Sequence, residues 1–150
     1  MNKLNISKAL TAGLLAGYGG QTKFVKTSRG SFEVSSSHFE NGEVVYHDEW
    51  TNGGGQEIVK VGVEMFTRVY AGGTINNNPE IIPKLIYFIQ ELKDKTRLFS
   101  DSSLDSGDWT YEYKIVDSDK DIDVTTGKET IYFQGKPVFV HVFVLSPIIK

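Results

Sequence analysis

Three segments of the sequence alternate as β-strands do, with aromatic residues on one face. In each segment, one position on that face carries a charged or titratable group instead: a carboxylate, a guanidinium and an imidazole. They belong to Asp48, Arg68 and His141. Burying a charged group is costly unless it is paired or hydrogen-bonded, so charges in an aromatic row indicate either a satisfied ion pair or a site. Opposite charges beside aromatic walls suit a polar or anionic small molecule.

We therefore predict a ligand pocket formed by six residues: Tyr46, Asp48, Trp50, Arg68, Tyr70 and His141. One alternative is that Asp48 and Arg68 only form an ion pair at the margin of a sheet, or that this face is solvated. Another is an enzyme in which Asp48 or His141 acts as general acid or base. The sequence favours a small binding or sensing module over an enzyme.

No motif assigns a catalytic residue, a cofactor or a metal. The histidines are His38, His47 and His141, their spacing matches no metal motif, and the chain has no cysteine. P-loop, dinucleotide and nucleophile-elbow motifs are absent as well. Glu57 and Glu129 each follow a glycine at the start of a predicted strand, which favours a solvated or turn-capping role over paired-carboxylate catalysis. We expect no cofactor and no metal.

Two sets of strands position the candidate residues. Alternation of apolar and polar residues predicts strands at 42–50, 55–61 and 65–70 in the first set, and at 107–115, 127–133 and 137–144 in the second. In the strand at 107–115 the inward row is Trp109, Tyr111, Tyr113 and Ile115. Residues 21–37 predict a strand or extended arm, and the polar segments 97–107 and 116–127 predict loops.

A helical pattern precedes each set of strands. Residues 6–16 place Ile6, Leu10 and Leu14 on one face, with Asn5 or Ser7 as the N-cap. Residues 79–95 carry an apolar stripe that consists of Ile82, Leu85, Ile86, Ile89 and Leu92.

The two sets, each with its helix, align with each other. Matched pairs are Gly42 with Gly107, Tyr46 with Tyr111, Glu57 with Glu129, Phe66 with Phe139, and Tyr70 with Phe143. The overlay predicts one domain, 1–150, built from internal repeats at approximately 1–78 and 79–150. Chance alignment of two amphipathic meanders is the alternative. Within the overlay, Asp48 corresponds to Tyr113 and Arg68 to His141, so we expect these to be positions at which the halves diverged for function.

These patterns together predict an α+β fold. Two helix-plus-antiparallel-meander repeats form one curved antiparallel sheet of about six to eight strands, with the two helices packed on one face. A β-sandwich is disfavoured because the apolar stripe of residues 82–92 needs a partner surface.

Composition and charge restrict the partners. With a net charge of -3 and scattered Lys and Arg, the chain has no basic cluster for nucleic acid. No apolar run approaches the roughly 18 residues of a membrane span. Residues 9–17 resemble a signal sequence only in part, and lack of cysteine fits a reducing compartment, so we expect a cytoplasmic protein. A protein–protein module or homodimer that exposes Tyr132, Phe133 or Phe139 is a third functional alternative.

Several short motifs occur in a fixed order along nearly the whole chain. They are Tyr18-x-Gly20, Ser28-Arg29-x-Ser31, Gly42-Glu43-x-x-Tyr46-x-Asp48, Gly55-x-Glu57 and Tyr70-x-Gly72, then Gly107-Asp108-x-x-Tyr111, Gly127-x-Glu129-x-Ile131-Tyr132 and Gly135-x-Pro137-Val138. In this order they resemble a bacterial family classed as a domain of unknown function, which occurs free-standing or fused to helix-turn-helix regulators.

The resemblance implies ligand sensing or protein contact more than catalysis, and it carries over no active-site residue. The chain departs from the family's pattern at Phe66, where the family tends to have tryptophan. It departs again at 53–57, a shortened form of the family's Gly-Gly-Glu-x-Phe-x-Gly-x-Glu stretch. If that loop shapes a ligand site, we expect its specificity to differ in this chain.

Overall fold

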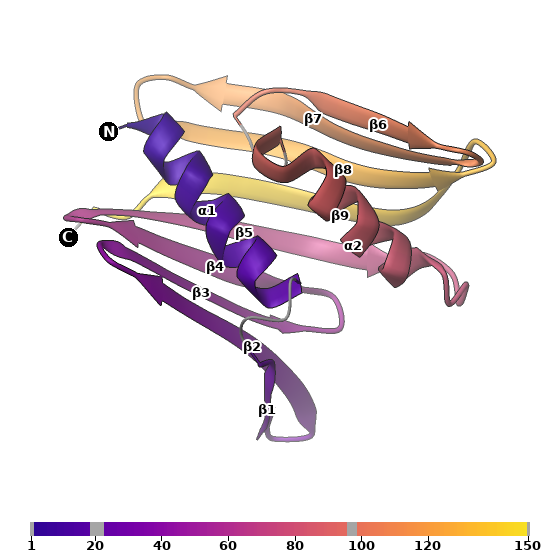
Figure 1. Cartoon of the computed structure of the whole chain (residues 1–150), viewed down its shortest axis with the longest axis horizontal. Helices are drawn as coiled ribbons and strands as arrows, with labels where there is room; N and C mark the ends of the chain where they lie inside the picture. Colours follow the sequence, from indigo (N-terminus) through magenta and orange to yellow (C-terminus); the bar gives the residue numbers. More distant parts are fainter. Residues whose placement is uncertain (1, 19–22, 96–98, 150) are drawn as a thin grey trace.

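The chain runs through a helix and five strands, then a second helix and four strands. The computed structural model describes residues 2–18, 23–95 and 99–149, and Figure 1 follows them along the sequence. The first half contains α1 (Lys3–Tyr18), β1 (Val25–Arg29), β2 (Phe32–Asn41), β3 (Val44–Thr51), β4 (Gly54–Val61) and β5 (Glu64–Thr74). The second half contains α2 (Ile81–Leu92), the 3-10 turn η1 (Lys93–Lys95), β6 (Ser102–Ser106), β7 (Trp109–Asp119), β8 (Val124–Phe133) and β9 (Lys136–Pro147).

All these strands join one antiparallel sheet in the order β1-β2-β3-β4-β5-β9-β8-β7-β6. Within each half, consecutive strands pair with each other, as expected when short turns connect them. The halves meet where β5 pairs with β9, and Tyr70 lies opposite Phe143 in that pairing. The sheet and the two helices confirm the predicted α+β class.

The described residues contain nine strands, more than the six to eight that the sequence predicted. The additional strand β6 lies in the segment 97–107, which was predicted to be a loop. Its sequence SSLDS has a single apolar residue, Leu104, which pairs with Tyr111 of β7. The predicted loop at 116–127 is also wrong in part, because β7 continues to Asp119 and β8 begins at Val124. The end of β7, residues 116–119, is exposed, so polar residues in this part of the strand face solvent at little cost.

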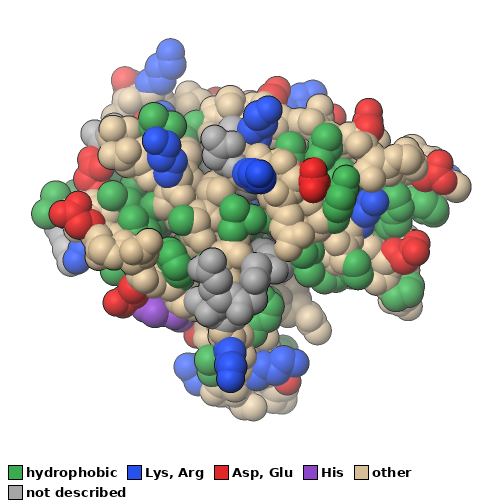
Figure 2. All heavy atoms as spheres, viewed as in Figure 1, with side chains coloured by type: hydrophobic (Ala, Val, Ile, Leu, Met, Phe, Trp, Pro, Cys, Tyr) green, Lys and Arg blue, Asp and Glu red, His purple; other side chains and the backbone are tan. Residues whose placement is uncertain are grey.

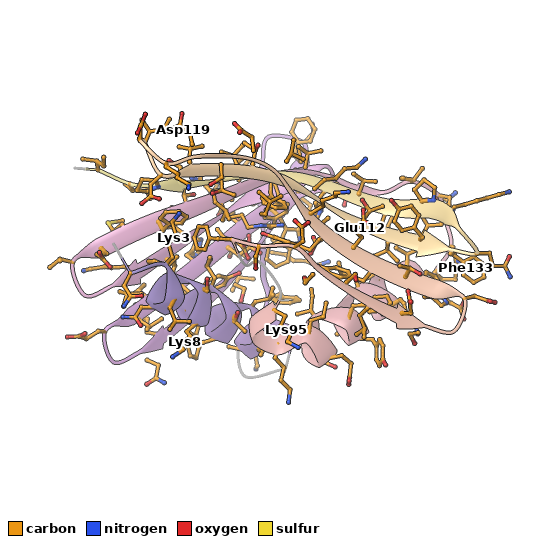
Figure 3. The ribbon with its side chains drawn as sticks, turned by 90° about the horizontal axis from the view of Figure 1, so that it is seen from above. Lys3, Lys8, Lys95, Glu112, Asp119 and Phe133 are labelled. Carbon is orange, nitrogen blue, oxygen red and sulfur yellow. The ribbon has the colours of Figure 1, made fainter. Side chains whose placement is uncertain are left out.

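Both helices lie over the same face of the sheet (Figures 1 and 3). Helix α1 packs against β2, β3 and β4. Helix α2 packs against the strands of the second half. The ring of Phe88 lies 5.6 Å from that of Tyr111, and Lys84 donates a hydrogen bond to Ser106. On this side of the molecule, basic and acidic side chains are interspersed (Figure 2).

The helix ends and faces differ in detail from the sequence prediction. Asn2 caps α1, because its side-chain oxygen accepts hydrogen bonds from the backbone of Leu4 and Asn5, so neither Asn5 nor Ser7 is the N-cap. In α2 the predicted stripe is confirmed in part: Leu85, Ile89 and Leu92 are buried. The buried face is nevertheless rotated, because Ile82 is 46% exposed whereas Ile81 and Phe88 are buried. The first turns of α2 are apolar on several sides, and the aromatic contact of Phe88 with Tyr111 selects the buried face.

The inward rows of the strands agree with the alternation in the sequence. Tyr46, Phe66 and Tyr70 are buried in the first half, as are Trp109, Tyr111 and Tyr113 in the second. Phe139, which one alternative took for an exposed contact residue, is 2% exposed. Neither helix of the described residues has the length and apolar character that a bilayer crossing requires.

Candidate ligand-binding site

The strand register gathers the polar residues of the helix-covered face. Asp48 of β3 lies opposite Glu57 of β4, and Glu57 lies opposite Arg68 of β5. On the other side of the β5–β9 junction, Glu129 of β8 lies opposite His141 of β9. These five charged or titratable positions therefore occupy neighbouring strands at the sheet's centre, on the face that the helices cover.

Arg68 is the centre of this group and has no solvent exposure. Its Nη1 lies 3.4 Å from Oε2 of Glu57, and its Nη2 lies 3.7 Å from Oε1 of Glu129. Burial by itself would lower the pKa of the guanidinium, but the charge of Glu129, with smaller contributions from neighbouring tyrosines, leaves that pKa raised. Arg68 therefore stays positively charged between the two carboxylates.

Each of the two glutamates also accepts a hydrogen bond from a tyrosine. The Tyr46 hydroxyl donates to Oε1 of Glu57 at 2.5 Å, and the Tyr111 hydroxyl donates to Oε2 of Glu129. Burial, the charge of Glu129 and this hydrogen bond together raise the pKa of Tyr111 well above its ordinary value. We call these five residues the buried charge cluster: Tyr46, Glu57, Arg68, Tyr111 and Glu129.

The predicted role of Glu57 and Glu129 is thereby wrong. Their exposed fractions are 0% and 1%, so neither is a solvated or turn-capping residue. The phase of strand alternation could have shown this, because Glu57 is in step with Val59, and Glu129 with Ile131, both of which are buried. A carboxylate in phase with a core residue needs a buried partner, and Arg68 supplies it.

A cavity of about 920 Å³ opens beside the buried charge cluster. It is bounded by residues 50–54 at the turn between β3 and β4, by residues 70–75 at the end of β5, by residues 139–142 of β9, and by α2. Helix α2 contributes the apolar side chains Ile82, Leu85 and Ile89. The cavity lining includes two carboxylates, those of Asp48 and Glu129, and the imidazole of His141.

Two hydrogen-bonded pairs fix four polar side chains of the cavity lining. The Tyr70 hydroxyl donates to Oδ1 of Asp48 at 2.9 Å, and Asp48 is 8% exposed. Nδ1 of His141 lies 3.3 Å from Oε1 of Glu129. The two pairs are adjacent, because the rings of Tyr70 and His141 lie 4.8 Å apart. Gly55 leaves room for the Tyr70 hydroxyl, which a Cβ at that position would approach to 2.6 Å.

The six residues predicted to bind a ligand divide into two groups. Asp48, Trp50, Tyr70 and His141 line the cavity. Tyr46 and Arg68 are instead enclosed in the buried charge cluster, next to the cavity but outside its lining. Alternation could place all six on one face but could not show which of them the neighbouring elements cover. Arg68 forms ion pairs with Glu57 and Glu129. These partners lie at the centre of the sheet, whereas the alternative prediction placed an Arg68 ion pair at the margin.

No family model, curated protein or solved structure matches this chain.

Within residues 2–18, 23–95 and 99–149, no three His, Asp or Glu side chains come together in a way that could hold a metal ion. His38 and His47 form an exposed cross-strand pair with their Nδ1 atoms 3.2 Å apart, and the Glu40 carboxylate lies 2.9 Å from the other ring nitrogen of His38. This pair lies on the sheet face opposite the cavity, since both residues alternate with buried or cavity-lining neighbours.

Proposed function

We propose that this chain is a small-molecule-binding or sensing module whose ligand occupies the cavity beside Asp48. The observation that carries the proposal is the cavity itself: about 920 Å³, with mostly apolar walls and a few polar groups in its lining. Small-molecule sites have this composition and occupy about 300–1,000 Å³. The fixed pairs Tyr70–Asp48 and His141–Glu129 support it further, because polar groups held in place before binding orient a ligand at low entropic cost.

The sequence resemblance to the bacterial domain family that also occurs fused to helix-turn-helix regulators further supports a sensing role. The turn between β3 and β4, where this chain departs from the family's pattern, contributes Asn52, Gly53 and Gly54 to the cavity wall. We therefore propose that the ligand specificity of this chain differs from that of the family.

The test is a ligand screen combined with a variant that fills the cavity. A metabolite collection is screened by thermal shift, and the affinity of each hit is measured for Ile82→Trp. Ile82 is exposed and lines the cavity, so an indole there occupies ligand space without disturbing the core. Glu91→Trp is the matched control, since Glu91 is an exposed residue of the same helix outside the cavity lining.

The expected result is an affinity loss of about tenfold or more in Ile82→Trp and no change beyond about twofold in Glu91→Trp. A hit that binds both variants as tightly as the unaltered protein lies elsewhere, and the proposal then fails.

A second candidate function is an enzyme that uses His141 as general base, and one contact favours it. Glu129 holds Nδ1 of His141, and His141 lines the cavity, which is the arrangement of an imidazole oriented by a carboxylate. If a ligand found in the screen is turned over, His141→Asn should abolish turnover while binding persists. Binding without turnover at any pH supports the binding module alone.

We also propose that the halves 1–78 and 79–150 are copies of one unit. The register supports this, because Tyr46 lies opposite Val59 and Glu57 opposite Arg68, while their matched residues Tyr111 and Glu129 lie opposite Ile131 and His141. Homologous sequences should keep the same matches between halves; matches that shift from one homologue to another would contradict the duplication. Curvature of the sheet stays a prediction.

A further inference from the structure

We propose that the ligand of this cavity is a cationic amine with an apolar body, whose positive charge lies at Asp48, in a cavity wall that also contains the rings of Trp50 and Tyr70. This inference rests on the proposed binding function and names the ligand class.

The first argument is the sign of the charge around the cavity. Its described lining includes two carboxylates, Asp48 and Glu129, and one imidazole, His141, but neither Lys nor Arg. The nearest guanidinium, that of Arg68, is fully enclosed and lies within 4 Å of both Glu57 and Glu129. An anionic ligand in the cavity would therefore face carboxylates, because the Arg68 guanidinium is enclosed and already pairs with Glu57 and Glu129.

The second argument is the balance of charge in the buried region. Asp48, Glu57 and Glu129 are three carboxylates at 8%, 0% and 1% exposure, and Arg68, the buried cation of the described residues, pairs with Glu57 and Glu129. Excess charge in a poorly solvated region is costly, and a cation from the ligand reduces that excess. A ligand amine at Asp48 adds positive charge to this region. The hydrogen bond from Tyr70 stabilises the Asp48 carboxylate without cancelling its charge.

The third argument is the aromatic wall. Trp50, Tyr70 and Phe139 line the cavity together with the carboxylates, and ring faces attract a cation that lies within about 6 Å. The ring of Phe24 meets that of Trp50 edge-on at 5.1 Å, which holds the indole in place. Ile82, Leu85 and Ile89 of α2 supply the apolar surface for the rest of the ligand. An amine attached to an aromatic or alkyl body matches both the carboxylates and the apolar surface of the lining.

The test compares probes that differ only in charge. Phenethylamine, phenylethanol and phenylacetate form one set, and hexylamine, hexanol and hexanoate form a second set with a linear body. Each is titrated at millimolar concentration into ¹⁵N-labelled protein, and the amide signals of residues 52–54 and 71–74 report the cavity. Binding by both amines at least about tenfold tighter than by their alcohols, with the anions weakest, is expected.

Asp48→Asn identifies the carboxylate that is responsible. The amide oxygen of the new side chain can still accept the Tyr70 hydrogen bond, so the fold should persist while the charge is lost. We expect amine affinity to fall about tenfold, toward that of the alcohol, and alcohol affinity to stay unchanged. Glu49→Gln is the control, because Glu49 is an exposed carboxylate of the same strand outside the cavity lining, and it should leave amine binding unaltered.

The outcomes separate this inference from the proposed function. If alcohols or anions bind in the cavity as tightly as amines, or if Asp48→Asn retains full amine affinity, the amine inference is overturned while the binding function stands. If no probe of either set perturbs the cavity signals, the amine inference is likewise overturned, and the metabolite screen with Ile82→Trp decides the proposed function.

Discussion

Arg68 and Glu129 form an ion pair at 3.7 Å across the junction between the two halves of the sheet. Arg68 belongs to β5, the last strand of the first half, and Glu129 to β8 of the second half, with β9 between them. Arg68 also pairs with Glu57 of its own half. One guanidinium therefore serves a carboxylate from each half, and the face of Phe143 lies 4.9 Å from it. This shared charge ties the halves together beneath the cavity.

Replacement of Arg68 by methionine should destabilise the protein strongly. Arg68→Met leaves two buried glutamates without their cation, and breaking a buried ion pair in this way costs about 3–5 kcal/mol of unfolding free energy. Urea unfolding followed by tryptophan fluorescence measures the loss. Lys60→Met, at an exposed position of β4, is the control and should change stability by no more than about 0.5 kcal/mol.

The same experiment can separate lost charge pairing from lost contacts. Adding Glu57→Gln and Glu129→Gln to Arg68→Met removes both uncompensated charges, and the amides can still accept the tyrosine hydrogen bonds. The triple variant should be more stable than Arg68→Met alone. A triple variant that is equally unstable would mean that the guanidinium acts through its volume and not through its charge.

A glycine within α1 should resist the substitution that normally stabilises helices. Gly-to-Ala changes in a helix ordinarily gain about 1 kcal/mol. At Gly13, however, a Cβ would lie 2.1 Å from Cγ of Tyr46, whose hydroxyl donates to Glu57. Gly13→Ala should therefore destabilise the protein by about 1–3 kcal/mol, as overpacking does. Chemical unfolding is the measurement, and a gain in stability would show that α1 can move away from the sheet.

Ala12 provides the comparison for that result. It is exposed on the same helix, so Ala12→Gly should report helix propensity alone and cost about 1 kcal/mol. If Ala12→Gly has no effect, the helix does not respond to propensity, and the Gly13 result then reflects only the contact with Tyr46.

Alkaline pH should reduce stability through Tyr111. Its pKa is raised in the folded protein, so between the unfolded value of about 10 and the folded value the folded state retains a proton that the unfolded state has released. This stabilising contribution is complete below about pH 10 and is lost as the pH rises further. Tyr111→Phe should remove up to about 1.4 kcal/mol per pH unit from the slope of unfolding free energy against pH.

Urea unfolding at a series of alkaline pH values, with tyrosinate absorbance recorded in parallel, provides the measurement. Equal slopes in the unaltered protein and in Tyr111→Phe would contradict the raised pKa. The loss of the hydrogen bond to Glu129 lowers the stability of the variant at every pH, so only the slopes are compared.

The sequence predicts which face of a strand a residue lies on, because side chains along a strand alternate with a period of two. Asp48, Arg68 and His141 lie on the helix-covered face because their aromatic neighbours in each strand do, and alternation alone predicts that. Alternation also carries the information for Glu57, but its position after a glycine at a strand start suggested a turn. Strand β6 was missed because Leu104 alone cannot establish a pattern.

The boundary between the cavity and the core could not be predicted. Whether Arg68 faces a ligand or the carboxylates depends on where α2 and the turn at 51–54 lie above the sheet, and those are long-range placements. The rotation of α2 has the same origin: its sequence permits two apolar stripes, and the contact between Phe88 and Tyr111 selects one. Local periodicity restricts such choices, but tertiary contacts make them.

The two tryptophans should respond differently to a ligand. Trp50 lines the cavity, whereas Trp109 is buried against Phe133 with ring centres 4.7 Å apart and is not part of the lining. Trp109→Phe leaves Trp50 as the only indole, and phenethylamine should then change the fluorescence saturably, with the affinity that the amide signals give. Trp50→Phe should show no saturable change and should bind the amine about two- to fivefold more weakly, because phenylalanine is a poorer cation–π partner than tryptophan. A saturable response that persists in Trp50→Phe and is lost in Trp109→Phe would place the ligand near β7, away from Asp48.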